Sequence, residues 1–360
     1  MTLAPYLAEP MFALPQARKE AALLQDLLAL TEEHMARCPA YRRLVEVTCP
    51  DYRKARSLAE LPFLPVSMFK THELASIGPD EVHMVLTSSG TTGQAVSRIL
   101  LDTATADLQS RALAATMVAV LGPKRLPMLI LDTRSLFKDR RLMSARGAGV
   151  MGMMRFGRAH VWALDEAMAP AEADIRAFLE RHGGEPFLMF GFTFMAWKYF
   201  LKPAADLGLD LSNGILVHSG GWKKLVEEAV DNRTFRSVAR ETTGLARIYN
   251  FYGMVEQIGS VFVEGEDGLL YPPNFADVIV RDPQTWEPAA PGETGVIQLL
   301  SVVPRSYPGH SLLTEDLGIV HDTDGGRAGR LGKSLSVVGR VPKTELRGCS
   351  DVHAYSGSRR

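Results

Sequence analysis

The chain has 360 residues, of which 46% are hydrophobic and 22% are charged, a balance typical of a globular protein with one or two domains. Its 40 Lys and Arg residues nearly balance 41 Asp and Glu residues, and no block of one charge stands out, so neither nucleic acid nor a membrane is an expected partner. The N-terminus has no signal-peptide pattern, no run reaches the roughly 20 apolar residues of a membrane helix, and the three cysteines have no pairing or metal spacing, which predicts a cytoplasmic location.

In the first part of the chain we predict a long helix, then a hairpin and then a second helix. Leucines recur near the helical period over residues 16–35, and His34 is expected at the surface near the end of that helix. Residues 82–86 and 97–102 are predicted as the two strands of a hairpin. Thr103–Leu121, rich in alanine and leucine, is predicted as the helix that follows.

The remainder changes character near residue 259. Before this point, apolar strand patterns alternate with helical patterns, which predicts an α/β unit. The predicted strands are residues 128–132, 187–190, 214–218 and Arg247–Tyr252, and the predicted helices are residues 167–181, 192–201 and 222–230. After it, short strands separated by Gly and Pro turns predict a β-rich part. These strands are residues 261–264, 277–280, 295–301, 317–321 and 335–338.

A loop rich in hydroxyl groups lies between the two hairpin strands. Its members are Thr87, Ser88, Ser89, Gly90, Thr91, Thr92 and Gly93. The two glycines permit backbone angles that aim consecutive amide groups inward, as in an anion-binding nest, and the five hydroxyls add donors for phosphate oxygens. The loop has no lysine, so it is not the P-loop of nucleotide-binding proteins. The alternative interpretation is an ordinary Ser/Thr/Gly surface turn.

Small residues and a tyrosine follow two of the predicted strands. The small residues are Ser219, Gly220 and Gly221, which leave room for a flat ring close to the backbone. Tyr252 and Gly253 begin the segment Y-G-M-V-E, which ends at Glu256 and places a carboxylate four positions after an aromatic face. Taken alone, Tyr252 is also explained as a core aromatic and Glu256 as a surface carboxylate or helix-start charge.

Two carboxylates and an arginine stand out in the β-rich part. Thr314, Glu315 and Asp316 are expected in a loop before a strand, and Arg340 ends the last long strand. Taken alone, Asp316 is also explained as a turn cap and Arg340 as a solvated residue at a strand end.

Together these stretches resemble the adenylate-forming superfamily of acyl-CoA synthetases, peptide-synthetase adenylation domains and firefly-type luciferases. The resemblance implies an α/β fold, the large N-terminal-type domain of that superfamily, with mixed sheets flanked by helices and a small β-rich subdomain. It implies ATP and Mg²⁺ as cofactors, with residues 87–93 around the ATP phosphates. Tyr252 would stack on adenine, Glu256 would hold Mg²⁺, Asp316 would accept hydrogen bonds from the ribose, and Arg340 would contact the nucleotide. The other implied nucleotide-binding residues are Ser219, Gly220, Gly221 and Gly253.

The chain departs from the superfamily pattern at two positions, where Val255 replaces a threonine and Glu315 replaces a glycine. The segment G-R-V-P-K-T-E-L-R-G-C-S-D at residues 339–351, the F-K-T-H-E-L stretch at residues 69–74 and the overall length are similar to the acyl-protein synthetase family. These are the LuxE-type subunits of the bacterial fatty acid reductase complex. The resemblance implies that Cys349 takes the acyl group from the adenylate and passes it to a partner.

The implied organisation is one large domain over residues 1–338, followed by a short tail over residues 339–360 in place of most of the usual C-terminal lid domain. Arg347 favours the thiolate of Cys349, although a small half-buried cysteine is the ordinary alternative. Because the lid normally supplies a lysine for adenylation, a second hypothesis is an acyltransferase that loads Cys349 from acyl-CoA without ATP. A third hypothesis is a non-catalytic subunit that binds nucleotide and regulates a reductase.

The substrate implied by the family is a fatty acid, and an aryl acid stays open. The acyl acceptor is expected to be an acyl reductase subunit or an acyl carrier protein. Phenylalanine, tryptophan and methionine side chains that could line an acyl pocket are equally explained as core. They are Phe192, Phe194, Met195, Trp197 and residues 151–154.

Overall fold

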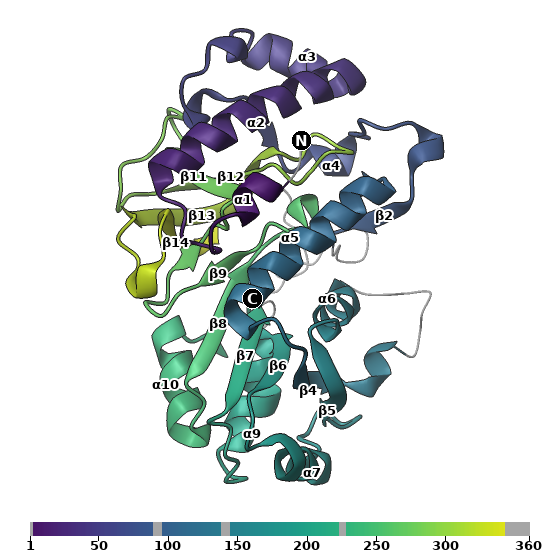
Figure 1. Cartoon of the computed structure of the whole chain (residues 1–360), viewed down its shortest axis with the longest axis vertical. Coiled ribbons are helices and arrows are strands. Elements are labelled where there is room, and N and C mark those ends of the chain that lie inside the picture. The colour runs from purple at the N-terminus through teal and green to yellow at the C-terminus, as the bar shows by residue number, and fades with distance from the viewer. Residues whose placement is uncertain (1–2, 89–95, 138–144, 223–227, 343–360) are drawn as a thin grey trace, which may run out of the picture.

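The computed structural model describes residues 3–88, 96–137, 145–222 and 228–342. Twelve strands of this described part pair in one mixed sheet, which runs through two lobes of the molecule (Figure 1). This arrangement confirms the expected α/β class with a β-rich part. Among the described residues, no helix has the length and hydrophobicity needed to cross a bilayer.

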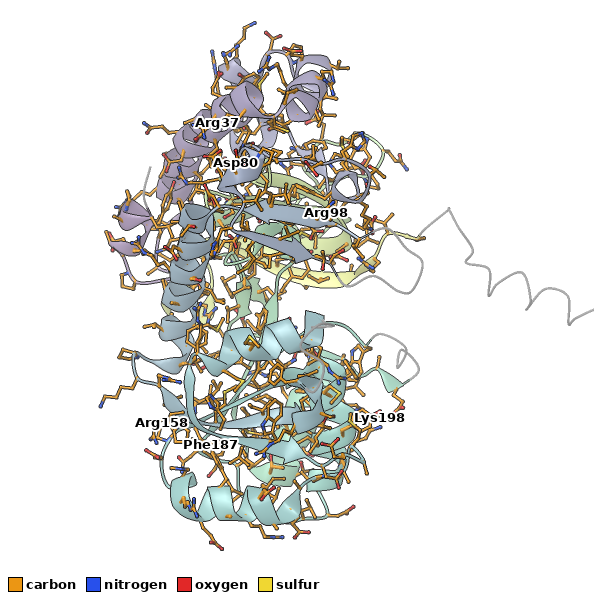
Figure 2. All side chains as sticks on the ribbon, turned by 90° about the vertical axis from the view of Figure 1, so that its right-hand side faces the viewer. Arg37, Asp80, Arg98, Arg158, Phe187 and Lys198 are labelled. Carbon is orange, nitrogen blue, oxygen red and sulfur yellow. The ribbon has the colours of Figure 1, made fainter. Side chains whose placement is uncertain are left out.

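The lower lobe holds the parallel half of the sheet. Its strands, in sheet order, are β5 (Gly157–Leu164), β4 (Leu126–Thr133), β6 (Phe187–Phe192), β7 (Gly214–Ser219) and β8 (Arg247–Tyr252). Helices cover both faces, so the strands read as continuous apolar runs rather than alternating ones. The side chain of Phe187 lies inside this lobe, whereas Arg158 and Lys198 lie at its surface (Figure 2).

The upper lobe holds the antiparallel half. Beyond β8 the sheet continues through β9 (Phe262–Glu264), β10 (Leu270–Tyr271), β14 (Lys333–Arg340), β13 (Ser311–Thr323), β12 (Thr294–Ser301) and β11 (Ala276–Arg281). The short strand β1 (Leu64–Pro65) pairs in parallel with β13. A separate hairpin, β2 (Met84–Thr87) and β3 (Arg98–Leu101), confirms the predicted hairpin strands.

The helices divide between the lobes. The upper lobe carries α1 (Ala4–Leu7), α2 (Gln16–Arg37), α3 (Pro39–Thr48) and α4 (Met68–Thr71). The lower lobe carries α6 (Ala145–Met154), α7 (Glu172–His182), α8 (Thr193–Met195), a π-helical segment (Ala196–Leu201), α9 (Lys202–Ala204) and α10 (Asn232–Thr243). Helix α5 (Thr103–Leu121) runs along both lobes, since Ala112 packs in the upper core and Met117 in the lower one (Figure 1).

Several local expectations need correction. Thr314, Glu315 and Asp316 lie inside β13 rather than in a loop before it, because the strand begins at Ser311 and pairs with β12 from its first residue. The helix expected at residues 167–181 begins only at Glu172, after an extended turn. The predicted helix over residues 222–230 lies mostly outside the described residues.

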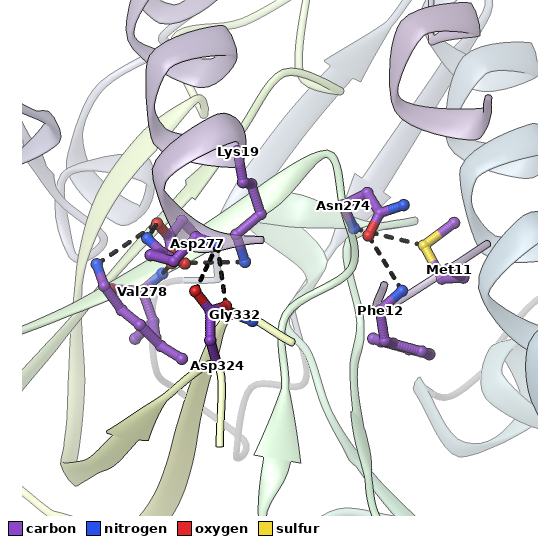
Figure 3. Close-up of polar contacts among 10 residues, drawn as sticks. Met11, Phe12, Lys19, Asn274, Asp277, Val278, Asp324 and Gly332 are labelled. Carbon is purple, nitrogen blue, oxygen red and sulfur yellow. Dashed lines mark hydrogen bonds and ion pairs between the residues drawn. The ribbon is translucent and has the colours of Figure 1, made fainter. Parts of the chain in front are cut away.

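A buried ion network ties the N-terminal segment to the β-rich lobe (Figure 3). Asp277 on β11 is fully buried and lies 3.8 Å from the ammonium of Lys19 on α2 and 3.4 Å from that of Lys333 on β14. Burial opposes ionisation of Asp277, but the two ammonium groups hold the pKa of its carboxyl below its usual value. Gln16 donates to the same carboxylate at 2.6 Å, so the start of α2 is hydrogen-bonded to β11. Lys333 links that strand to β14 through the same carboxylate.

Replacing Asp277 with Asn is expected to lower the free energy of unfolding by about 3–5 kcal/mol, because it leaves the buried Lys19 without its counter-charge. Urea denaturation measures the effect. Asp51→Asn is the matched control, because its ion pair with Lys54 is exposed to solvent and should contribute little to stability. Equal small losses in the two variants would contradict the expectation.

His34 is buried, not at the surface as the helical pattern suggested. Its Nδ1 lies 2.8 Å from the Ser76 hydroxyl, and its ring stacks on that of His310 at 4.9 Å between centroids. The His310 Nε2 in turn lies 2.9 Å from the Thr31 hydroxyl. Burial lowers the pKa of His34 to about 3 and that of His310 well below its usual value. Both rings are therefore neutral parts of the upper core.

These histidines predict a loss of stability in acid. Between pH 6.5 and about 3 the unfolded chain binds a proton at His34 that the folded chain does not, so stability is full above this window and falls as pH drops through it. Each such group steepens the fall by up to about 1.4 kcal/mol per pH unit. Urea denaturation across this pH range should show a shallower dependence for His34→Gln than for the wild type. The exposed His72→Gln serves as the control, and an unchanged slope in His34→Gln would contradict the account.

Candidate active site

The parallel strands β6, β7 and β8 end side by side at the boundary between the lobes. In the sheet register Phe192 pairs with Ser219, and Ser219 pairs with Phe251, the residue before Tyr252. Gly220 follows with a φ of +84°, and a Cβ atom there would lie 3.1 Å from the Phe192 ring. A side chain at this position would therefore be strained as well as crowded. Among the described residues, none comes within 4 Å of a Cβ atom added at Gly221.

Three of the predicted nucleotide residues meet across this boundary. The Tyr252 hydroxyl at the end of β8 donates to Asp316 Oδ2 at 2.7 Å, and Arg340 Nε donates to Asp316 Oδ1 at 3.2 Å. Asp316 and Arg340 face each other in the β13–β14 register. Burial raises the pKa of Tyr252 well above its usual value, and the Asp316 carboxylate adds to the shift. The tyrosine is therefore a neutral donor at physiological pH.

A second carboxylate extends this wall toward α4. Glu315 lies 3.5 Å from the ammonium of Lys70 and 3.8 Å from the guanidinium of Arg340. The wall thus runs from Tyr252 through Asp316, Arg340 and Glu315 to Lys70. Lys70 belongs to the stretch at residues 69–74 that carries the family resemblance, but it was not predicted as a site residue, because its approach to Glu315 depends on residues far along the chain.

Glu256 lies in the short 3₁₀ turn Val255–Gln257 that follows β8, with only 5% of its surface exposed. Burial raises the pKa of its carboxyl, and the nearby Ser97 hydroxyl and Lys70 ammonium oppose that shift. Ser97 also closes the hairpin loop, because its amide donates to the Ser88 hydroxyl at 2.9 Å and its carbonyl accepts from the Ser88 amide at 3.2 Å. The base of the predicted phosphate loop is therefore held beside Glu256.

Two further predicted residues, Thr87 and Gly253, are chain neighbours of Ser88 and Tyr252, and the others lie outside the described residues. Thr87 ends β2, where it pairs with Arg98, and Gly253 follows Tyr252 with an added Cβ only 3.0 Å from Val261. The loop residues Ser89, Gly90, Thr91, Thr92 and Gly93 lie outside the described residues, as does Cys349.

Three of the side chains considered for an acyl pocket are buried in the core, namely Met153, Met195 and Trp197. The Trp197 ring packs against Phe235 of α10, whereas Met151 is 48% exposed. Two surface cavities, of about 740 and 360 Å³, lie away from the wall described above. The first lies beside β5 and α7 and the second beside α2 and α3. Neither is lined by a predicted site residue.

Comparisons with known proteins identify sequences and folds that are similar to this chain. The family model described as Acyl-protein synthetase, LuxE, matches residues 6–356. A long-chain-fatty-acid–luciferin-component ligase of Vibrio harveyi is 24% identical over 320 residues, which span 81% of this chain and 77% of that protein. The protein of the same name from Aliivibrio fischeri is 22% identical over 286 residues, or 74% of this chain and 71% of that protein.

Solved structures show the same fold at low sequence identity. An open conformation of 2-hydroxyisobutyryl-CoA ligase, in complex with 2-HIB-AMP and CoA, matches with a TM-score of 0.68 and 18% identity over 93% of this chain and 78% of that one. The same enzyme in its postadenylation state gives a TM-score of 0.69 at 18% identity over 93% and 71%. These similarities confirm the expected fold of the adenylate-forming ligases and carry no residue roles.

Proposed function

The chain belongs to the acyl-protein synthetase family LuxE and is an acyl-protein ligase, and on that premise we propose that it activates a carboxylic acid with ATP and transfers the acyl group to Cys349. The observation that carries the proposal is the hydrogen bonding of Tyr252 and Arg340 to Asp316, close to Glu256 and the base of the hairpin loop. Residues predicted separately from three distant stretches thereby share one site.

The wall fits the nucleoside part of ATP. An ionised carboxylate offers about four acceptor positions, and Asp316 uses one oxygen for Tyr252 and the other for Arg340. Acceptor capacity remains for ribose hydroxyls on both oxygens. The Tyr252 ring supplies a flat apolar face for the purine, and the backbone at Gly220 and Gly221 leaves room for it.

Glu256 and the base of the hairpin loop fit phosphates and a magnesium ion. Mg²⁺ usually takes one or two carboxylates together with substrate phosphates rather than a cage of protein ligands. Glu256 supplies one such carboxylate, and the described residues contain no cluster of three ligating side chains. The buried Ser97 hydroxyl lies beside the Glu256 carboxyl and favours its charged form, which is the form that binds a metal ion. A bound Mg²⁺ would offset the negative charge of the phosphates.

The proposed chemistry has two steps. A carboxylate oxygen of the acid attacks the α-phosphorus of ATP, the bond from that phosphorus to the bridging oxygen breaks, and pyrophosphate leaves. The Cys349 thiolate then attacks the acyl carbonyl of the mixed anhydride, AMP leaves, and a thioester forms. A thiol of an acyl reductase subunit or carrier protein would accept the acyl group in turn. The names of the curated relatives support a long-chain fatty acid as the substrate.

The test measures pyrophosphate release and intact protein mass together. The protein is incubated with ATP, Mg²⁺ and, in separate reactions, fatty acids of graded length and aryl acids. We expect pyrophosphate release with fatty acids and a mass gain equal to one acyl group. Absence of pyrophosphate with every acid, or an adduct that forms from acyl-CoA without ATP, would contradict the proposal.

A further inference from the structure

We propose that Lys70 binds the ATP phosphates, so that its ammonium supplies positive charge to the adenylation site. The inference rests on the proposed function and assigns a residue to it. Lys70 lies on the single-turn helix α4 in the upper lobe, outside every stretch that the nucleotide-binding pattern singled out. Two structural anchors and one ion pair lead to it.

The first anchor joins α4 to the nucleotide wall. Just before the helix, Leu64 pairs in parallel with Leu312 on β13, and the Val66 amide donates to the Leu313 carbonyl at 2.9 Å. Leu313 immediately precedes the segment that contains Glu315 and Asp316. Because the Phe69 amide donates to the Val66 carbonyl at 3.2 Å, the helix begins directly from this strand pairing. The backbone of α4 is therefore held in register with the wall.

The second anchor joins α4 to Glu256. Phe69 is buried and packs edge-on against Tyr307, with 5.9 Å between ring centroids. The Tyr307 hydroxyl donates to the Glu256 carbonyl at 2.9 Å and accepts from Gln109 Nε2 at 3.3 Å. A change in the position of α4 would therefore disturb the turn that carries Glu256. Lys70 directly follows Phe69, whose ring makes this contact with Tyr307.

The Lys70 ammonium pairs with one carboxylate of the site and acts electrostatically on another. Its Nζ lies 3.5 Å from Glu315 Oε1, and the side chains of both residues are about one-third or less exposed, at 30% and 26%. The same ammonium acts on the Glu256 carboxyl, where it opposes the upward pKa shift caused by burial. A long ion pair of this kind is weak, so the ammonium can turn to a phosphate at little cost.

A lysine suits this position because an ammonium is a compact point charge that binds phosphate from one side. Negative charge on the phosphates grows and shifts as the acid oxygen attacks the α-phosphorus. A fixed cation beside them stabilises that charge without reorganisation. Lys70 would thereby act together with the Glu256 carboxylate, which would hold Mg²⁺.

The test is calorimetric titration of the full chain with ATP and Mg²⁺ and, separately, with adenosine. Lys70→Met is expected to weaken ATP binding by about 10- to 100-fold, as for loss of a hydrogen bond to a charged group, and to leave adenosine binding unchanged. Lys70→Arg should recover most of the ATP affinity because it keeps the charge. Lys54→Met, which removes an exposed lysine far from the site, is the control and should bind both ligands like the wild type.

Equal ATP affinity in Lys70→Met and the wild type would overturn the inference while leaving the proposed function in place, provided that the wild type releases pyrophosphate. Parallel losses of ATP and adenosine affinity in Lys70→Met would also overturn it, because they indicate a general disturbance of the site. A wild type that binds no ATP would overturn both proposals.

Discussion

Replacing Cys349 with alanine is expected to abolish the acyl–protein adduct while leaving adenylation intact. In the proposed mechanism the Cys349 thiolate is the nucleophile that receives the acyl group, and alanine offers no atom to accept it. With ATP and a fatty acid in excess, the wild type should release one pyrophosphate for the thioester and a second for the next adenylate. The variant should stop after a single equivalent, with the acyl-adenylate held in the site. Mass spectrometry of intact protein and a pyrophosphate assay measure both quantities.

Cys49→Ala provides the matched control, because Cys49 is a half-buried thiol whose Sγ lies 3.6 Å from the Glu60 carbonyl. Burial raises the pKa of this thiol, so it is a poor nucleophile. We expect the Cys49 variant to form the adduct at the wild-type level. An adduct that survives in Cys349→Ala, or that disappears in Cys49→Ala, would show that the acyl group is carried elsewhere.

Replacing Glu256 with Gln is expected to slow adenylation by about 100- to 1,000-fold, the usual effect of removing one electrostatic contact to a developing charge. The amide keeps the shape of the side chain but loses the charge that would hold Mg²⁺. The requirement for Mg²⁺ should rise in the same variant, which a titration of the metal at fixed ATP measures by ATP–pyrophosphate exchange.

The fold of the variant is expected to be preserved, because burial already disfavours the charged form of Glu256 and an amide is less costly to bury. Glu241→Gln, at an exposed position on α10, is the control for a simple loss of charge. Wild-type exchange rates and an unchanged Mg²⁺ requirement in Glu256→Gln would rule out its proposed role.

Local patterns predicted some elements of the fold closely. The predicted ranges for β8 and α5 match the structure, because each has a strong local signal: an apolar run for the strand, and for the helix an Asp102 side chain that accepts from the Thr105 amide at 2.7 Å. Helix α10 was missed although its signals were present. Asp231 caps its start, Gly244 ends it in the left-handed conformation, and Phe235, Ala239 and Thr243 bury one face at helical spacing, although few of its residues are apolar.

Single residues of the candidate site could be predicted from the sequence, but the contacts between them could not. Tyr252, Asp316 and Arg340 were each singled out by motif resemblance, but their bonding depends on β9 and β10, which join the parallel half of the sheet to β14. No local pattern specifies that pairing. Lys70 was not predicted as a site residue for a similar reason, since only the β1–β13 pairing and the Phe69–Tyr307 contact bring it to Glu315.

Burial likewise could not be inferred from helical spacing alone. His34 lies near the end of α2 beside the exposed residues Glu32 and Arg37, and its polar character suggested the surface. In the structure Ser76 and the His310 ring provide it with partners in the interior. The interior therefore accepts a polar side chain where distant residues satisfy it, which a local pattern does not reveal.

The most direct test of the account is a crystal structure of the full chain with a non-hydrolysable ATP analogue, Mg²⁺ and a fatty acid. We predict the purine against Tyr252, the ribose hydroxyls on Asp316, and the phosphates between the loop of residues 87–93 and the ammonium of Lys70. A nucleotide bound outside this boundary between the two lobes, or a complex with an empty loop, would contradict the account.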